Sequence, residues 1–285
     1  MPVELSNYEY ILLKQLIEEK TGIEIGQDKA YLIETRFERI LKEQKLSSFQ
    51  QLYHAVQSGS DNTLLEKIID AITTNETLWF RDQTPWLYIE KVLMHQYIDE
   101  LRSKKKSSVR IWSAASSSGQ EAYSTAMMID HYLELNNITD VTLSQFEIIA
   151  TDISQSILDI AQIGRYDEIS IMRGLDDTYR SKYFTKTGTY YELDEKIKHA
   201  VSFRNFNLKN SFLLLGRFDV VFLRYIMIYF SEHLKLDISQ KLCSTLSEGG
   251  ILFLGSSELY RCISNNFMTL YFNQGMLYQN EKNVI

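Results

Sequence analysis

The stretch that decides the fold is Val109-Arg-Ile-Trp-Ser-Ala-Ala-Ser-Ser-Ser-Gly-Gln-Glu-Ala-Tyr-Ser124. An apolar run changes into a turn of small residues and then into a helical pattern that carries Met127, Met128 and Ile129. This order suits a nucleotide-like ligand, because small side chains let the ligand approach the backbone and the helix N-terminus offers free N–H groups. Gly119 is the only glycine of the turn, so the match to a dinucleotide fingerprint is poor. An ordinary strand-to-helix loop is the alternative.

Two later apolar runs also end in polar residues. Phe146-Glu-Ile-Ile-Ala-Thr-Asp152 ends in a carboxylate, and Phe218-Asp-Val-Val-Phe-Leu-Arg224 ends in a cation. Because the carboxyl ends of parallel strands share one edge of a sheet, these residues indicate a ligand site at that edge. Asp152 could accept hydrogen bonds from both hydroxyls of a ribose, or cap the helix that begins near Ser154. Glu121 could face a ligand ammonium group, or simply complement the helix dipole.

The chain from residue 109 onward alternates between strand and helix patterns, which predicts an α/β fold with a mostly parallel, doubly wound sheet. A polar, tyrosine-rich stretch at about 167–199 breaks the alternation. Thr187-Gly188-Thr189 resembles a hairpin turn in this stretch, so we predict a small β insertion there. The predicted strands are 109–113, 146–151, 200–204, 219–223, 250–254 and 276–279, and the predicted helices are 120–135, 154–163 and 231–246.

The first 74 residues have only helical patterns. Apolar residues recur on one helical face in the segments 8–16, 33–41, 48–56 and 64–72. Four short helices bury little surface alone, so we expect a helical domain, 1–74, that packs against a second domain, 75–285. Thr84-Pro85 predicts an N-cap followed by proline at the first helical position, with a helix that continues to about Leu101.

The composition is that of an ordinary globular protein, with 45% hydrophobic and 24% charged residues. No apolar run is long enough for a membrane span and the N-terminus lacks a secretion-signal pattern, so we expect a cytoplasmic protein without membrane insertion. The net charge of −7 argues against a general nucleic-acid binder. The histidines and cysteines show no ligand spacing, so we predict no metal site.

Two further segments each allow two interpretations. Asn75-Glu-Thr-Leu-Trp-Phe-Arg81 is either a linker with two buried aromatic residues or a clamp across a cleft between the domains. Tyr229, in Arg224-Tyr-Ile-Met-Ile-Tyr-Phe230, is either a core residue or a side chain beside a ligand at the strand end.

Read together, these stretches resemble the CheR-type family of chemotaxis-receptor glutamate O-methyltransferases, which use S-adenosylmethionine. The resemblance spans nearly the whole chain and is carried, in the family's order, by residues 30–39, 74–82, 111–124, 150–152, 224–230 and 246–258. It implies a Rossmann-like methyltransferase sheet with a small N-terminal helical domain and a small β insertion. It also implies which residues contact the cofactor: Asn75, Thr77, Arg81, Glu121, Asp152, Asn207, Leu208, Arg224 and Tyr225. The resemblance further implies that Arg81 and Tyr229 are the catalytic positions, beside the transferred methyl group.

The activity that the resemblance implies is methyl transfer to glutamate carboxylates of receptor cytoplasmic helices, giving methyl esters for sensory adaptation. The helical domain is then the part that lies along the receptor. Arg36, Arg39, Lys42 and Lys45 form a basic stripe on one helix, and the first three are plausible contacts to an acidic receptor helix. The alternative is a solvated face balanced by Glu34, Glu38 and Glu43.

The chain departs from the family pattern at a few positions. Ala115 stands where glycine is usual, and Tyr225 stands where asparagine is usual. The loop around 187–189 is short, so we expect no docking site for a receptor tail. Two other functions stay open: a methyltransferase of the same fold with another substrate, and a non-catalytic receptor scaffold that binds S-adenosylmethionine or S-adenosylhomocysteine.

Overall fold

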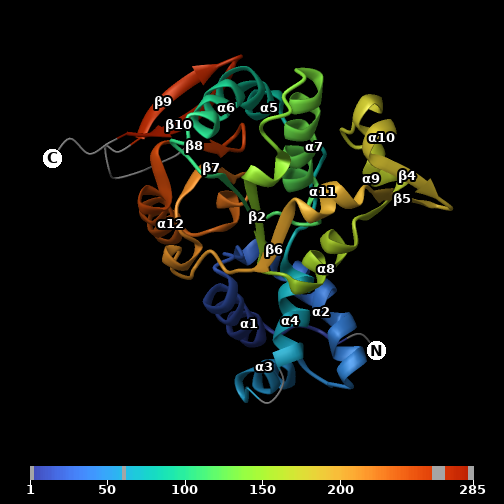
Figure 1. Ribbon diagram of the computed structural model, residues 1–285. Helices are drawn as coiled ribbons and strands as arrows, with labels where there is room; N and C mark the ends of the chain where they lie inside the picture. Colours follow the sequence, from blue (N-terminus) through green and yellow to red (C-terminus); the bar gives the residue numbers. More distant parts are fainter. Residues whose placement is uncertain (1–2, 60–61, 259–266, 282–285) are drawn as a thin grey trace.

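The computed structural model describes residues 3–59, 62–258 and 267–281. Its centre is a seven-stranded sheet in the order β6-β2-β1-β7-β8-β10-β9 (Figure 1). The first five strands in this order are parallel, and β10 and β9 add an antiparallel edge. The strands are β1 (Val109–Ala114), β2 (Phe146–Asp152), β6 (Val201–Asn205), β7 (Phe218–Leu223), β8 (Leu246–Leu254), β9 (Phe267–Phe272) and β10 (Gly275–Asn280).

The predicted doubly wound sheet is confirmed, because helices cover both of its faces. In β7, Val220 and Phe222 pack on one face against α5, α6 and α7, while Val221 and Leu223 pack on the other face against α12. Burial on both faces explains why this strand is a continuous apolar run rather than an alternating one. The covering helices are α5 (Gln83–Tyr88), α6 (Met94–Arg102), α7 (Gln120–Leu135), α8 (Gln155–Ile163) and α12 (Glu232–Thr245).

Two local predictions need correction. The helix after residue 82 begins at Gln83, and a π-helical turn (Ile89–Leu93) joins α5 to α6. Asp82, not Thr84, therefore precedes the first helical residue, and the Asp82 carboxylate makes no capping bond because Arg224 and Tyr225 occupy it. Strand β9 was not predicted, because its side chains are only partly buried and its position is defined by pairing with β10.

The N-terminal helices pack around an apolar core of their own. They are α1 (Asn7–Thr21), α2 (Ala30–Gln44), α3 (Phe49–Gln57) and α4 (Asn62–Ile72), which confirms the four predicted helices. Leu13, Phe37, Phe49 and Ile68 lie at the centre of this core. Ser6 begins α1 with a capping box, a local signal that fixes where the helix starts. Figure 1 shows these helices below the sheet. The domain boundary at residue 74 remains a prediction.

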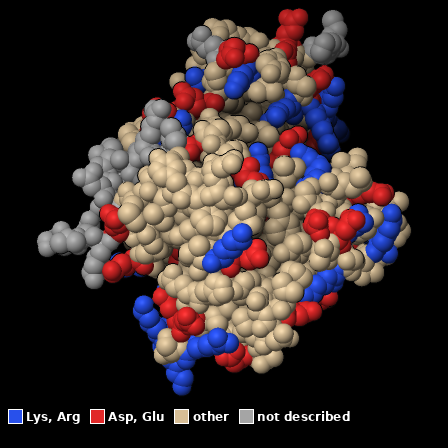
Figure 2. All heavy atoms as spheres, turned by 90° about the horizontal axis from the view of Figure 1, so that it is seen from above, with Lys and Arg blue, Asp and Glu red and all other residues tan. Residues whose placement is uncertain are grey.

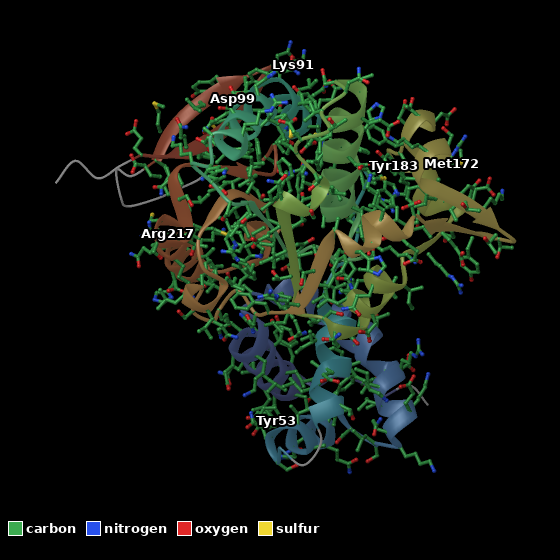
Figure 3. All side chains as sticks on the ribbon, in the orientation of Figure 1. Tyr53, Lys91, Asp99, Met172, Tyr183 and Arg217 are labelled. Carbon is green, nitrogen blue, oxygen red and sulfur yellow. The ribbon has the colours of Figure 1, made fainter. Side chains whose placement is uncertain are left out.

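The predicted β insertion is a separate three-stranded sheet in the order β3-β5-β4. Its elements are β3 (Arg165–Asp167), α9 (Glu168–Met172), α10 (Asp177–Tyr183), β4 (Phe184–Thr187), β5 (Tyr190–Leu193) and α11 (Glu195–His199). The hairpin between β4 and β5 turns at Gly188, which has a φ of 63°. Tyr183 ties the insertion to α7, since its hydroxyl lies 3.0 Å from the Asp130 carboxylate (Figure 3).

The surface carries mixed charge. On the face seen in Figure 2, groups of basic and acidic side chains lie mostly around the margin of a broad area with few charges. No helix within the described ranges combines the length and the apolar character that a bilayer crossing requires.

Candidate functional site

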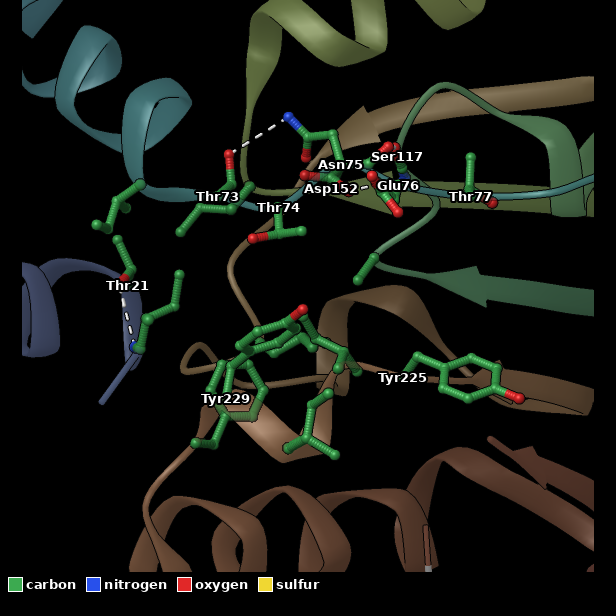
Figure 4. Close-up of a pocket in the computed structure, with 18 of the residues that line it drawn as sticks. Thr21, Thr73, Thr74, Asn75, Glu76, Thr77, Ser117, Asp152, Tyr225 and Tyr229 are labelled. Carbon is green, nitrogen blue, oxygen red and sulfur yellow. Dashed lines mark hydrogen bonds between the residues drawn. The ribbon is translucent and has the colours of Figure 1, made fainter. Parts of the chain in front are cut away.

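A cavity of about 330 Å³ lies between the N-terminal helices and the carboxyl edge of the sheet. Its walls come from three places: the helical part of the chain, the segment 72–81, and the loops that follow β1, β2, β6 and β7. Asn75, Ser117 and Asp152 form one wall, and Tyr229 lies across from them (Figure 4). A concave site of this size, at the point where the strand order reverses, is where α/β sheets bind small ligands.

The loop after β1 lines the cavity with residues that have small side chains, so a ligand can come close to its backbone. Ala115 and Ser117 have φ values of 55° and 51°, a left-handed conformation that costs non-glycine residues energy. Gly119 begins α7 with a φ of 92°, and a Cβ there would lie 3.1 Å from side-chain atoms of three neighbours. The hydroxyl of Ser116 is buried without a hydrogen-bond partner in the described structure. The loop therefore offers a ligand both close backbone approach and an unused polar group.

Asp152 is held in place by the backbone. Its side chain is buried, and its two oxygens accept the N–H groups of Ser117 at 2.8 Å and Ser154 at 3.1 Å. Burial raises the pKa of the Asp152 carboxyl, these amide hydrogen bonds lower it, and nearby Asp70 raises it further, so that the net direction is upward. The side chain that caps α8 is that of Ser154, which accepts from the Ile157 N–H. Asp152 thus lines the cavity rather than serving as the helix cap.

Arg224 lies at the centre of a buried ion network. Its side chain is only 2% exposed, and it donates to Glu121 at 2.8 Å and to Asp82 at 2.7 Å. Glu121 also accepts from the Ser113 hydroxyl at 2.7 Å. The Nε–H of Arg224 is buried without a partner among the described atoms. This network joins the strand end of β7, the first turn of α7 and the segment before α5.

Arg81 and Tyr225 are stacked. The Arg81 guanidinium carbon lies 3.4 Å from the centre of the Tyr225 ring. The Tyr225 hydroxyl donates to Asp82 at 2.6 Å, and hydrogen bonding to Tyr225 and Arg224 lowers the pKa of Asp82 although burial opposes this. Tyr225 itself has a φ of 59°. The contact to Arg81 gives the tyrosine a role that sequence patterns did not indicate.

The N-terminal part reaches the cavity through the segment after α1. The Glu24 N–H donates to the Tyr229 carbonyl at 2.8 Å, beside a β-bridge between Ile23 and Phe230. Asn207, predicted to contact the cofactor, donates its amide to the Lys20 carbonyl at 2.7 Å and also lines the cavity. Among the described residues, the Tyr229 hydroxyl has no hydrogen-bond partner.

The structure brings the predicted cofactor contacts together around one cavity. All of them line it: Asn75, Thr77, Arg81, Glu121, Asp152, Asn207, Leu208, Arg224 and Tyr225. The Asn75 carbonyl also accepts from the Ser117 hydroxyl at 2.8 Å, which ties the segment 72–81 to the loop after β1. Their contacts to a ligand remain predictions. No group of three metal-ligating side chains occurs in the part of the chain that the structure describes.

The three residues predicted to contact a receptor lie in different environments. Arg36 faces the cavity and donates to the Ile72 carbonyl at 2.9 Å, at the end of α4. Arg39 and Lys42 are exposed and pair with Glu43 and Glu38 on the same helix. Both ion pairs agree with the alternative interpretation of the stripe, in which it is a solvated face whose charges are balanced by glutamates of the same helix.

Two acids that support the cavity wall without lining the cavity were not singled out in the sequence. Glu258 is buried and accepts three backbone N–H groups, from Tyr225 at 2.6 Å, Gly255 at 2.9 Å and Met227 at 3.0 Å. It thereby joins the loop after β7 to the loop after β8. Asp82 is the other. A weak signal for Glu258 was present, because it is an acid four residues beyond the apolar strand β8, whereas Asp152 is the last residue of β2.

Two family models match the chain: "CheR methyltransferase, all-alpha domain" over residues 8–73 and "CheR methyltransferase, SAM binding domain" over residues 75–275. Chemotaxis protein methyltransferase Cher2 of Pseudomonas putida is 36% identical over 274 residues, which cover 96% of this chain and 98% of that protein. Chemotaxis protein methyltransferase 1 of Vibrio cholerae is 37% identical over 278 residues, which cover 97% of this chain and 98% of the relative.

Proposed function

This chain belongs to the CheR methyltransferase family, and from that premise we propose that it methylates glutamate side chains in the cytoplasmic helices of chemotaxis receptors. Membership makes it an S-adenosylmethionine-dependent methyltransferase. The proposed products are glutamyl methyl esters that serve sensory adaptation, and the proposed substrate places the protein in the cytoplasm.

One observation carries the proposal of a carboxylate acceptor. Three cations line the cavity without an ion-pair partner among the described residues: Lys29, Arg36 and Arg81. The cavity lining as a whole has five cations and four acids (Glu24, Glu76, Glu121 and Asp152), so it carries a net charge of +1, against −7 for the whole chain. A site with positive charge to spare attracts an anionic side chain and disfavours a neutral or cationic one.

The residues of the opposite wall fit S-adenosylmethionine. We assign Asp152 to the ribose hydroxyls, since its ionised oxygens have acceptor capacity beyond the two amides they already bind. Glu121 is assigned to the ammonium group of the cofactor. The unpartnered groups, the Ser116 hydroxyl and the Arg224 Nε–H, supply donors that a polar ligand would satisfy.

When bound, S-adenosylmethionine supplies a methyl group on a sulfonium, which departs as a neutral thioether while the carboxylate oxygen takes the methyl. No general base is needed, because a glutamate with a pKa of about 4.3 is already ionised at neutral pH. The protein has to align the carboxylate and exclude water from it. Arg81 holds one carboxylate oxygen in this proposal, and the free hydroxyl of Tyr229 orients the other.

The test is a transfer assay with methyl-labelled cofactor and a receptor cytoplasmic fragment. Wild-type protein is expected to label the fragment, and replacing its acceptor glutamates with glutamine is expected to abolish the label. Arg81→Ala and Tyr229→Phe should each lower kcat at least about tenfold, as expected when a group that orients a reactant is lost. Arg102→Ala and Tyr271→Phe, at exposed positions, are the matched controls.

The outcomes separate the candidate functions. Labelling of other substrates but not of the receptor fragment would replace the proposed acceptor. Binding of S-adenosylhomocysteine in calorimetry without any methyl transfer would support the non-catalytic scaffold instead. Wild-type turnover in Arg81→Ala or Tyr229→Phe would remove that residue from the proposed mechanism.

The receptor contact is proposed to use the exposed Arg39 and Lys42 of α2. Charge reversal of both, Arg39→Glu with Lys42→Glu, should weaken binding of the receptor fragment and flatten its salt dependence, because exposed charges attract over a distance set by ionic strength. The reversal of Arg102 is the control. Binding that does not change with salt in the wild-type protein would contradict the stripe as a contact.

A further inference from the structure

The backbone, the hydroxyl and the ring of Tyr225 are each held by neighbouring residues. Its backbone N–H donates to the buried Glu258 carboxylate at 2.6 Å. Its hydroxyl donates to Asp82 at 2.6 Å and lies 2.9 Å from the Ser256 hydroxyl. Its ring borders Gly255 so closely that a Cβ at that glycine would lie 2.8 Å from the ring. The ring therefore presents a defined surface rather than a rotating one.

The backbone conformation at Tyr225 is unfavourable for a bulky residue. Its φ of 59° lies in the left-handed region, which a bulky residue occupies at a cost and which asparagine enters more readily. Such conformations persist only where surrounding contacts impose them, and they gather at functional sites. A smaller residue at this position could provide neither the stack with Arg81 nor the hydroxyl bond to Asp82.

The backbone of Arg81 is equally constrained, but its side chain is not. Its neighbours Phe80 and Asp82 have φ values of 46° and 57°, and its carbonyl accepts from Arg224 at 2.5 Å and Trp86 at 3.1 Å. Beyond the Cα, the guanidinium makes no ion pair with any described residue. The Tyr225 ring, 3.4 Å from the guanidinium carbon, is the contact that sets its position.

We propose that Tyr225 is a positioning residue that holds the Arg81 guanidinium flat on its ring and so sets how Arg81 meets the acceptor carboxylate. A stacked guanidinium keeps its N–H groups at its edge, where they can donate to a carboxylate. The negative face of the ring also balances part of the cationic charge. Arg81 can then align the acceptor oxygen without binding it so tightly that its nucleophilicity is lost. The inference rests on the proposed role of Arg81.

The experiment is a double-variant cycle on methyl transfer to the receptor fragment. The variants are Tyr225→Leu, Arg81→Met and the two combined, with Tyr271→Leu as a control at an exposed tyrosine. Tyr225→Leu should lower kcat about tenfold, the scale of one desolvated cation–π contact, and should weaken the binding of S-adenosylhomocysteine by clearly less than that, because the ring acts on the acceptor through Arg81. In the Arg81→Met background, Tyr225→Leu should cause no further loss, because the residue it positions is already gone.

Two further variants guard the test against misfolding. Tyr225→Phe keeps the ring and should recover most of the rate that Tyr225→Leu loses. Tyr225→Asn removes the ring and the hydroxyl bond to Asp82 but adopts the left-handed backbone more easily, so its melting temperature should fall less than that of Tyr225→Leu while the loss of kcat persists.

Other results would overturn the inference. Losses of Tyr225→Leu and Arg81→Met that simply multiply would show that the two residues act independently. A fall in cofactor affinity as large as the fall in kcat would return Tyr225 to a cofactor-binding role. If Arg81→Met itself turned over at the wild-type rate, the proposed function of Arg81 would fail first, whatever Tyr225 does.

Discussion

The backbone N–H of Glu24 donates to the carbonyl of Tyr229 over 2.8 Å, which links the segment after α1 to the loop that carries the proposed methyl-proximal tyrosine. Close by, the Lys209 ammonium donates to the Glu18 carbonyl at 3.1 Å and to the Glu19 carbonyl, at the last turn of α1. A cation at a helix C-terminus is favourable, because the carbonyls there carry partial negative charge. The N-terminal helices are therefore attached to the cavity wall through α1.

Lys209→Met should loosen this attachment. Loss of charge-assisted hydrogen bonds to α1 is expected to speed the native-state hydrogen exchange of the Glu24 amide about tenfold, through easier local opening. Hydrogen exchange followed by mass spectrometry measures this directly. Lys105→Met, at an exposed loop position, is the control. Unchanged protection at Glu24 would mean that α1 stays docked without Lys209.

The affinity for S-adenosylhomocysteine should depend on the ionisation of Asp152. Burial raises the pKa of this carboxyl above the ordinary value of 3.8, against the lowering effect of its amide hydrogen bonds. Protonation removes acceptor capacity, so affinity is expected to fall as the pH drops through the raised pKa. Calorimetric titration between neutral and mildly acidic pH measures this dependence.

The same raised pKa has the opposite effect on the folding stability of the ligand-free protein, to which Asp152 should contribute more as the pH falls. An ionised Asp152 costs folding energy at neutral pH, and that cost shrinks as the pH falls through the raised pKa and is gone only below the ordinary value of 3.8. Asp152→Asn should bind S-adenosylhomocysteine about 10- to 100-fold more weakly, which is the loss expected when hydrogen bonds to a charged group are removed. The affinity of this variant should also show no decline at acidic pH. An acidic decline that persists in Asp152→Asn would assign the titration to another group.

Arg224→Met should destabilise the fold strongly. The substitution leaves the carboxylates of Asp82 and Glu121 in partly buried positions without their shared partner. Breaking a buried ion pair on one side costs about 3–5 kcal/mol, whereas an exposed pair contributes about 0–1 kcal/mol. Urea unfolding midpoints give the comparison, with Arg102→Met, which breaks the exposed pair to Asp140, as the control. Equal losses in the two variants would contradict a buried role for Arg224.

Two glycines of the insertion should respond differently to alanine. Gly174 has a φ of 100°, and a Cβ there would lie 2.3 Å from the Trp79 carbonyl oxygen. Gly188 has a φ of 63° with no atom within 4 Å of a Cβ. Gly188→Ala is expected to cost about 1–2 kcal/mol from backbone conformation alone, and Gly174→Ala about 1–3 kcal/mol more because a neighbour must move. Thermal unfolding measures both, and similar midpoints would mean that the insertion shifts freely against Trp79.

The order of strands and helices followed from local patterns. Phe146–Asp152 and Phe218–Leu223 are apolar runs because they are buried on both faces, and the helix at 120–135 agrees with the predicted bounds. The polar residue at each strand end indicated the ligand edge, because parallel strands must end together. The predicted cap at Thr84 shows the limit of local signals. The helix begins at Gln83, directly after Asp82, whose carboxylate is held by Arg224 and Tyr225 from a distant part of the chain.

The amino-acid sequence by itself determined the sheet, its ligand edge and the acid at position 152, because hydrophobic periodicity and strand ends are local properties. Only the tertiary structure decided that Arg36 of α2 faces the cavity, that Glu258 joins two loops, and that Arg81 lies on the ring of Tyr225. The last two contacts join residues about 30 and more than 140 positions apart in the chain. No local pattern records such pairings, since they arise when packing brings distant loops to one edge of the sheet.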